Sequence, residues 1–206
     1  METIKIGDPD AVVKAAVVLR AGGVILYPTD TLYGLGVDAL SDDAVAKVRE
    51  LKGRDARKPI HAIVADMEMA SKYGEVHEVA LALARAYLPG PLSLILKKKP
   101  EIETGIAQGI DTFCIRIPVN RFCMNLARAF GKPYTTTSAN QSGEVPARTV
   151  EGILAQLGDS ASLIDLVIDA GELPERSPST IVDVSSGKIE VVREGAIPSA
   201  EILGES

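Results

Sequence analysis

The strongest constraint on the fold of this chain is the alternation of helix-like and strand-like segments in its N-terminal part. Asp8-Pro9-Asp10 is typical of a helix start, apolar residues follow at helical spacing, and Gly22-Gly23 predicts the helix end. The run Val24-Ile25-Leu26 then predicts a buried strand. Ser41 predicts the cap of a second helix, and residues 60–65 predict the next strand. This alternation is typical of an α/β sheet.

The later segments predict a mixed sheet. Strand-like runs cover residues 92–96, 112–117, 134–137, 164–169, 180–184 and 189–192, and helix-like runs cover residues 66–72, 76–88, 120–130 and 149–157. Ser185-Ser186-Gly187 predicts a hairpin turn, so the last two strands should be antiparallel. A chain of 206 residues is long enough for one domain. We therefore expect one twisted sheet of parallel and antiparallel strands, flanked by helices.

Composition limits the function classes. The net charge of −6 argues against a general polyanion binder. Cys114 and Cys123 lie nine positions apart, which fits neither a zinc cluster nor a disulfide framework, and their apolar surroundings predict buried, inert thiols. The sequence has no charged-then-apolar leader and no apolar run of membrane-spanning length, so we expect a cytoplasmic protein with no membrane partner.

The predicted strand at residues 24–27 runs into Pro28, Thr29, Asp30 and Thr31, with Gly34 and Gly36 close behind. Hydroxyls, a carboxylate and glycines at a strand end are typical of a small-molecule site at the edge of an α/β sheet. A polar loop that only turns the chain is an equal alternative. The glycines also match the G-x-G-x-x-A dinucleotide pattern, although Thr29 to Tyr33 separate them from the strand. A dinucleotide-dependent oxidoreductase is therefore a further, weaker hypothesis, which depends on Gly34 and Gly36 alone.

A local basic cluster follows the second predicted helix. Within twelve positions the chain carries Lys47, Arg49, Lys52, Arg54, Arg57 and Lys58. Cations that converge around Gly53 would suit a phosphate, whose charge must be neutralised during phosphoryl or nucleotidyl transfer. A solvated helix terminus explains the same cations, because the helix dipole also favours them there. The cluster alone leaves both interpretations open.

Other catalytic machinery has little support in the sequence. The two histidines, His61 and His77, fit no metal or triad spacing. Ser138-Ala139-Asn140 places a hydroxyl and an amide where they could fix a ligand, and a simple turn is the alternative.

Taken together and in order, the motifs resemble the YrdC-like domain of threonylcarbamoyl-AMP synthases. They are Tyr27-Pro-Thr-Asp-Thr31, Gly34-Leu-Gly36, Lys52-x-Arg54, Lys58-Pro59, Pro89-Gly90-Pro91, Arg116-x-Pro118, Ser138-Ala-Asn140, Ser179-Thr180-Ile-Val-Asp183 and Arg193-x-Gly195. The resemblance covers residues 9–197, which we expect to form one domain of the short form, followed by a tail at residues 198–206. A subgroup of the family lacks the Lys-x-Arg and Ser-x-Asn pair, and this chain keeps both.

The resemblance implies a YrdC-like fold with a basic concave cleft and a nucleotidyltransferase that makes threonylcarbamoyl-AMP and pyrophosphate from L-threonine, bicarbonate and ATP. Mg²⁺ would enter with ATP, held by phosphate oxygens and water. The product would serve the machinery that modifies adenosine beside the tRNA anticodon. The alternative is a module of the same fold that binds tRNA or other structured RNA without chemistry, in a strongly salt-dependent way.

The resemblance also implies roles for particular residues. Thr31, Arg116 and Thr136 would bind L-threonine, with the Arg116 guanidinium on the carboxylate. Lys52 and Arg54 would be the catalytic cations of the phosphate clamp. ATP would contact Lys52, Arg54, Lys58, Thr112, Ser138, Asn140, Arg148, Ser179 and Arg193. Some members of the family have Asn where this chain has Lys58.

Overall fold

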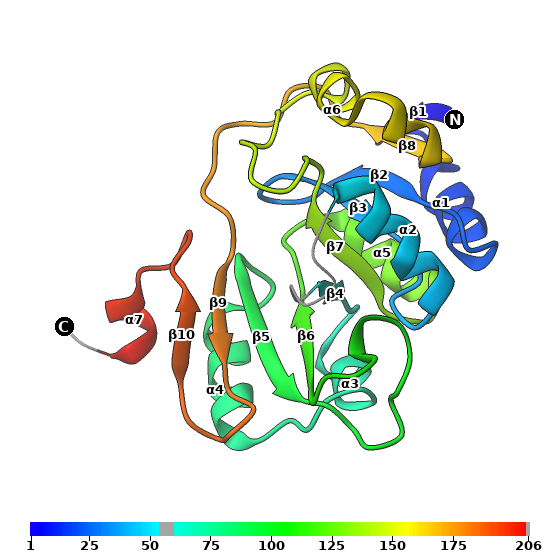
Figure 1. Cartoon of the computed structure of the whole chain (residues 1–206). Helices are drawn as coiled ribbons and strands as arrows, with labels where there is room; N and C mark the ends of the chain where they lie inside the picture. Colours follow the sequence, from blue (N-terminus) through cyan, green and yellow to red (C-terminus); the bar gives the residue numbers. More distant parts are fainter. Residues whose placement is uncertain (54–59, 205–206) are drawn as a thin grey trace.

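The computed structural model describes residues 1–53 and 60–204 of the chain. In these ranges the strands form one ten-stranded mixed sheet in the order β1-β8-β2-β3-β7-β4-β6-β5-β9-β10 (Figure 1). The strands are β1 (Glu2–Lys5), β2 (Ile25–Pro28), β3 (Tyr33–Gly36), β4 (His61–Ile63), β5 (Leu92–Lys97), β6 (Thr112–Arg116), β7 (Tyr134–Ser138), β8 (Leu166–Asp169), β9 (Thr180–Asp183) and β10 (Glu190–Arg193). The predicted fold class is confirmed.

Helices flank this sheet. They are α1 (Ala11–Arg20), α2 (Asp42–Lys52), α3 (Met67–Ser71), α4 (Glu78–Tyr87), α5 (Arg121–Phe130), α6 (Val150–Leu157) and α7 (Ser199–Leu203), with short 3₁₀ turns η1 (Gly105–Ala107) and η2 (Gly158–Leu163). The predicted caps at Ser41, Asn120 and Thr149 are confirmed, because each side chain accepts a hydrogen bond from a backbone N–H three residues on. None of the helices in the described ranges is long and apolar enough to span a membrane.

The sheet mixes both strand orientations as the sequence predicts. β8 pairs in parallel with β1 and β2, and β5 pairs in parallel with β9. β7 is antiparallel to both β3 and β4, which joins the two halves of the sheet. The predicted terminal hairpin of β9 and β10 is also antiparallel. β2, β7 and β6 lie near the middle of the strand order. Their carboxyl ends carry Pro28, Ser138 and Arg116, respectively.

The run at residues 24–27 is apolar throughout because the sheet is covered on both faces there. Val24 and Leu26 belong to the main apolar core, whereas Ile25 and Tyr27 belong to a second core beneath α1 and α5. Successive strand residues point to opposite faces, so a strand between two cores needs apolar side chains at every position. Farther along the sheet, a cluster of Ile95, Cys114 and Ile181 forms a smaller apolar group.

The segment after β2 is a tight β-hairpin. β2 and β3 pair from Ile25 with Gly36 to Pro28 with Tyr33, so the pairing continues through Pro28. Gly34 and Gly36 lie inside β3, and neither has the positive φ of a turn glycine. The dinucleotide hypothesis is therefore wrong, because its glycines must lie in a loop between a strand and a helix.

Both cysteines pack into the fold. Cys114 and Cys123 are buried and not disulfide-bonded, and burial raises the pKa of Cys123 to about 12. Both thiols therefore stay protonated at neutral pH, as expected for inert cysteines.

In the predicted tail, α7 places Ile202 in the main core, and the Tyr87 hydroxyl donates to the Glu201 carbonyl at 3.2 Å.

Candidate functional site

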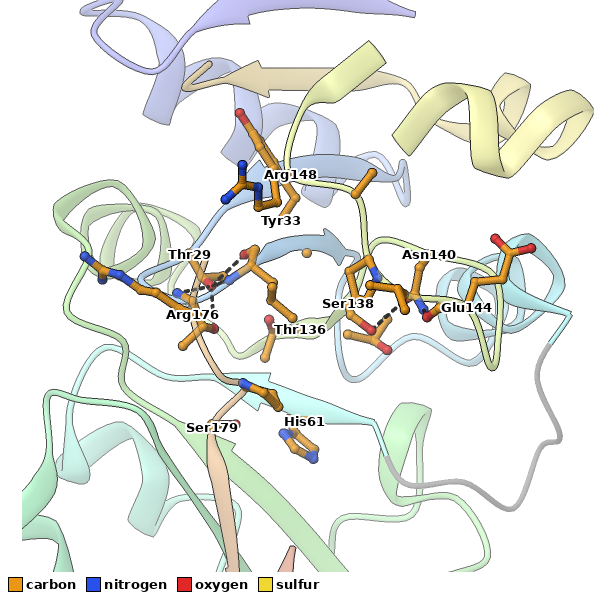
Figure 2. A pocket seen from close by; sticks show the side chains of 18 of the residues that line it. Thr29, Tyr33, His61, Thr136, Ser138, Asn140, Glu144, Arg148, Arg176 and Ser179 are labelled. Atoms are coloured by element: carbon orange, nitrogen blue, oxygen red, sulfur yellow. Dashed lines mark hydrogen bonds between the residues drawn. The ribbon is translucent and has the colours of Figure 1, made fainter. Parts of the chain in front are cut away.

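A cavity of about 840 Å³ lies between the two halves of the sheet (Figure 2). Its walls come from the β2–β3 hairpin, the end of α2, β4, the end of β6, β7 with the loop behind it, and β10. The final wall is the strap, which we define as residues 170–179 between β8 and β9. In Figure 1 the strap runs from the upper half of the sheet to the lower half. Segments from the whole chain thus meet at one site.

The hairpin turn at residues 29–32 is held by the hydroxyl of Thr29. Thr29 Oγ1 accepts hydrogen bonds from the backbone N–H groups of Thr31 and Leu32, each at 3.1 Å, and donates to the Leu32 carbonyl at 2.7 Å. Hydroxyl-to-backbone bonds of this kind stabilise tight turns. The turn places the hydroxyl of Thr31 against the cavity, 3.1 Å from that of Thr29. The stretch is therefore both of the predicted alternatives, a turn and a cavity wall.

Arg116, at the end of β6, brings a buried positive charge to the same wall. Its Nη2 donates to Asp30 Oδ1 at 2.6 Å and to Thr31 Oγ1 at 3.0 Å. Its Nε is buried and has no hydrogen-bond partner within residues 1–53 and 60–204. Thr136 of β7 completes this part of the cavity. A guanidinium in a cavity that threonine hydroxyls also line can bind a carboxylate.

Lys52 is tied to the loop that follows β7. Its Nζ donates to the Ser138 carbonyl, to the Asn140 carbonyl at 2.9 Å and to Asn140 Oδ1 at 3.2 Å. Ser138 Oγ also donates to Asn140 Oδ1 at 2.6 Å. Lys52 as a whole residue is only 3% exposed. Lys52 thus lines the cavity and its ammonium holds this loop. Its predicted contact with phosphate stays a prediction.

More cations reach the cavity from the strap side. Arg148 pairs with Glu172 of the strap, and Arg193 donates to the Ser179 carbonyl at 2.7 Å. Burial lowers the pKa of Arg193, and the positive charge of Arg116 lowers it further. Two guanidiniums close enough to affect one another create a positive potential that favours an anionic ligand.

The cavity gathers most of the predicted site residues. Those that line it are Thr31, Lys52, Arg116, Thr136, Ser138, Asn140, Arg148, Ser179 and Arg193. Thr112 is not among them: it begins β6, on the same strand face as Arg116 but about 13 Å away at the other end. Its predicted contact with ATP has no support from this geometry. The predicted positions Arg54 and Lys58 lie outside the described residues.

The sequence did not point to some residues of this cavity. His61 lines it because β4 pairs with β7, which places His61 opposite Thr136. Arg176 lines it from the strap, and its Nη1 donates to the Asp30 carbonyl at 2.7 Å. Figure 2 shows Arg176 beside Thr29, across the pocket from Asn140. An isolated histidine and an arginine in a polar linker carry no motif, so only the fold could identify them.

The fold and the cavity define an α/β protein with one mixed sheet and a central cavity that hydroxyl and guanidinium groups line. The family model described as "Telomere recombination", for the Sua5, YciO and YrdC proteins, matches residues 17–195. The chain belongs to this Sua5/YciO/YrdC family.

Several relatives show where the chain stands within that family. It is 40% identical over 177 residues to a protein of Methanocaldococcus jannaschii named "Putative threonylcarbamoyl-AMP synthase", covering 86% of this chain and 82% of that one. It is 36% identical over 196 residues to the "Threonylcarbamoyl-AMP synthase" of Mus musculus, and the match covers 92% of this chain and 68% of that protein.

Solved structures agree with these sequence relatives. The structure of Pyrococcus abyssi Sua5 complexed with L-threonine has a TM-score of 0.86 and 30% identity, and it covers 99% of this chain. This chain spans 60% of that protein's length. The YciO structure of E. coli has a TM-score of 0.82 and 27% identity, covering 98% of this chain and 97% of that one.

Proposed function

We propose that this chain is a threonylcarbamoyl-AMP synthase. One observation carries the proposal: the carboxylate-binding group of Arg116, Thr31 and Thr136 opens into the same cavity as Ser138, Arg148, Ser179 and Arg193. The named relatives and the Sua5 complex with L-threonine support it. The products would be threonylcarbamoyl-AMP and pyrophosphate, which makes the enzyme a nucleotidyltransferase.

The reaction needs no protein nucleophile. The amine of L-threonine attacks the carbon of bicarbonate, a C–N bond forms, and water leaves as the carbamate is produced. A carbamate oxygen then attacks the α-phosphorus of ATP, the bond to the bridging oxygen breaks, and pyrophosphate leaves with the electron pair. The enzyme's task is to hold the reactants in line and to neutralise phosphate charge. A cavity built from hydroxyls and guanidiniums suits that task.

The threonine end of the cavity would lie at Arg116. The Arg116 guanidinium would bind the α-carboxylate, with the hydroxyls of Thr31 and Thr136 beside it. This end is enclosed, since Thr31, Arg116 and Thr136 are all at most 8% exposed. A carbamate is short-lived in water, so an enclosed site favours its use over its decay.

The nucleotide end would lie toward the loop after β7 and the strap. Arg148, Arg193 and the hydroxyls of Ser138 and Ser179 would bind ATP, and Arg54 and Lys58 remain predicted contacts outside the described residues. Mg²⁺ would be held by the triphosphate and water, since it keeps several waters and needs only one or two protein carboxylates. In residues 1–53 and 60–204 no three His, Cys, Asp or Glu side chains form a metal-binding group.

Pyrophosphate release tests the proposal directly. The protein is incubated with ATP, Mg²⁺, bicarbonate and L-threonine, and release is compared with reactions that lack threonine or bicarbonate. We expect release that depends on both. Release that is the same without threonine would disprove the synthase.

The RNA-binding alternative makes a different prediction. Structured RNA that binds through phosphates would lose affinity steeply as salt rises, whether or not threonine is present. A protein that binds tRNA in this way and releases no pyrophosphate would favour that alternative. We expect a cytoplasmic enzyme whose product is used by the tRNA-modifying machinery.

A further inference from the structure

Asp30 is a buried acid beside the cavity to which the proposed function assigns no role. The side chains of Asp30 and Arg116 are each only 6% exposed, and Arg116 Nη2 lies 2.6 Å from Asp30 Oδ1. A charge-assisted hydrogen bond removed from water fixes the geometry of both partners. The carboxylate therefore holds the guanidinium in one orientation.

Asp30 also connects separate segments of the chain. Its Oδ2 accepts a hydrogen bond from the backbone N–H of Val119, at 3.2 Å, on the turn between β6 and α5. Its backbone carbonyl accepts from Arg176 of the strap. The side chain thus joins the hairpin turn to the end of β6, and the backbone joins it to the strap.

The hydrogen bonds of Arg116 show what this orientation leaves for a ligand. Nη2 has two hydrogens, and the two oxygens near it are Asp30 Oδ1 and Thr31 Oγ1. The buried Nε has no partner in the described part of the chain. A buried donor without an acceptor is costly, so a ligand that supplies one is favoured. By pairing with Nη2, Asp30 orients Arg116 and so sets which of its N–H donors face that ligand.

We propose that Asp30 is a positioning residue, which orients Arg116 so that its remaining donors meet the α-carboxylate of L-threonine. The inference rests on the proposed function for the identity of the substrate. Asp30 itself lines a smaller neighbouring cavity of about 480 Å³, together with Val119 and Arg176, and not the main one. Its effect reaches the main cavity through Arg116, so it acts on threonine and leaves ATP largely unaffected.

The test separates threonine binding from ATP binding in the Asp30→Asn variant. Asparagine keeps the shape and an oxygen but removes the charge. We expect the KM for L-threonine to rise about tenfold or more, since a hydrogen bond to a charged group is weakened, while the KM for ATP changes less than about twofold. Calorimetric titration with L-threonine alone should show a matching rise in Kd. Asp30→Glu, which keeps the charge, should restore part of the affinity.

Asp38→Asn is the matched control. Asp38 is also a largely buried aspartate, with Oδ1 accepting from the Leu40 N–H at 2.9 Å and Oδ2 paired with Lys132, but it does not line either cavity. We expect both KM values to stay at their wild-type level. A comparable rise in the KM for threonine in this control would mean that loss of any such aspartate has the effect.

Other outcomes are equally decisive. A wild-type threonine KM and Kd in Asp30→Asn would overturn the inference, and so would an equal rise in both KM values with a lower unfolding temperature. If Asp30→Asn does not fold, Asp30→Glu must show the threonine-selective rise instead. If the wild-type protein binds threonine more tightly than the variant but releases no pyrophosphate, the inference stands and the synthase fails. If the wild-type protein does not bind threonine, both are wrong.

Discussion

The ammonium of Lys52 illustrates what a sequence cannot reveal about a single cation. The Lys52-x-Arg54 pattern predicts a phosphate clamp because cations at a helix end suit an anion. In the structure Lys52 is buried, and its Nζ bonds to acceptors of Ser138 and Asn140. Burial and partners depend on the distant loop after β7, so local pattern alone could not assign this role.

Replacing Lys52 tests this structural role. Lys52→Met removes the donor described for the Asn140 carbonyl and one of the two donors to the Ser138 carbonyl and to Asn140 Oδ1, so we expect the free energy of unfolding to fall by about 1–3 kcal/mol. The displaced loop should also lower pyrophosphate release by about tenfold or more. Denaturant unfolding and the release assay measure these two effects.

Lys47→Met provides a matched control on the same helix. The Lys47 Nζ donates only to the exposed Gly22 carbonyl, at 2.7 Å, among the hydrogen bonds described. We expect its unfolding free energy to change by less than about 0.5 kcal/mol, with normal pyrophosphate release. Equal losses in the two variants would contradict the buried role of Lys52.

At the scale of elements, the sequence predicts the helices better than the hairpin. Ser41, Asn120 and Thr149 mark helix starts because a side-chain cap is a local interaction. Glycine often supplies the positive φ of a turn, so the sequence favours a turn at Gly34 and Gly36. In the structure the role of Gly36 is steric: a Cβ there would lie 2.8 Å from Tyr27 Cε1 and 2.9 Å from Ile25 Cγ1. The neighbours that exclude a side chain become visible only once β2 and β3 are paired.

Adding that Cβ should therefore weaken the hairpin. Tyr27 and Ile25 are fully buried and cannot move freely, so we expect Gly36→Ala to reduce the free energy of unfolding by about 1–3 kcal/mol. Urea unfolding measures this change. Gly7→Ala is the comparison, because no atom lies within 4 Å of its Cβ and its φ is not positive. If both variants unfold at the same urea concentration, the steric explanation is wrong.

At the scale of the whole molecule, the cavity depends on contacts between distant parts of the chain. Thr31, Arg116 and Arg193 could be grouped from the sequence only through the family resemblance, because no local rule relates positions so far apart. The fold class, by contrast, follows from local strand and helix patterns. No sequence pattern predicts the position of Arg176, because the strap has no regular structure and its path depends on the order of the strands.

Ligands that bind between the two halves of the sheet should stabilise the whole fold. At a concentration of ATP and threonine about a hundredfold above their Kd, binding to the folded state alone contributes about 2.7 kcal/mol. For a chain of this size the unfolding temperature should rise by roughly 5–10 °C. Thermal unfolding with ATP, with threonine and with both measures the shift. No rise with either ligand would contradict the assignment of the cavity.

The sheet order also has a consequence for how the chain matures during synthesis. β2 requires β8 as its neighbour, and the cavity requires the strap and β10, which are the last parts of it to leave the ribosome. A nascent chain that ends before Arg193 therefore cannot complete the pocket, even though its hairpin turn was made early. Pairing between such distant strands is slow, since a long loop must close first. Ligand binding should thus become possible only after β10 has left the ribosome.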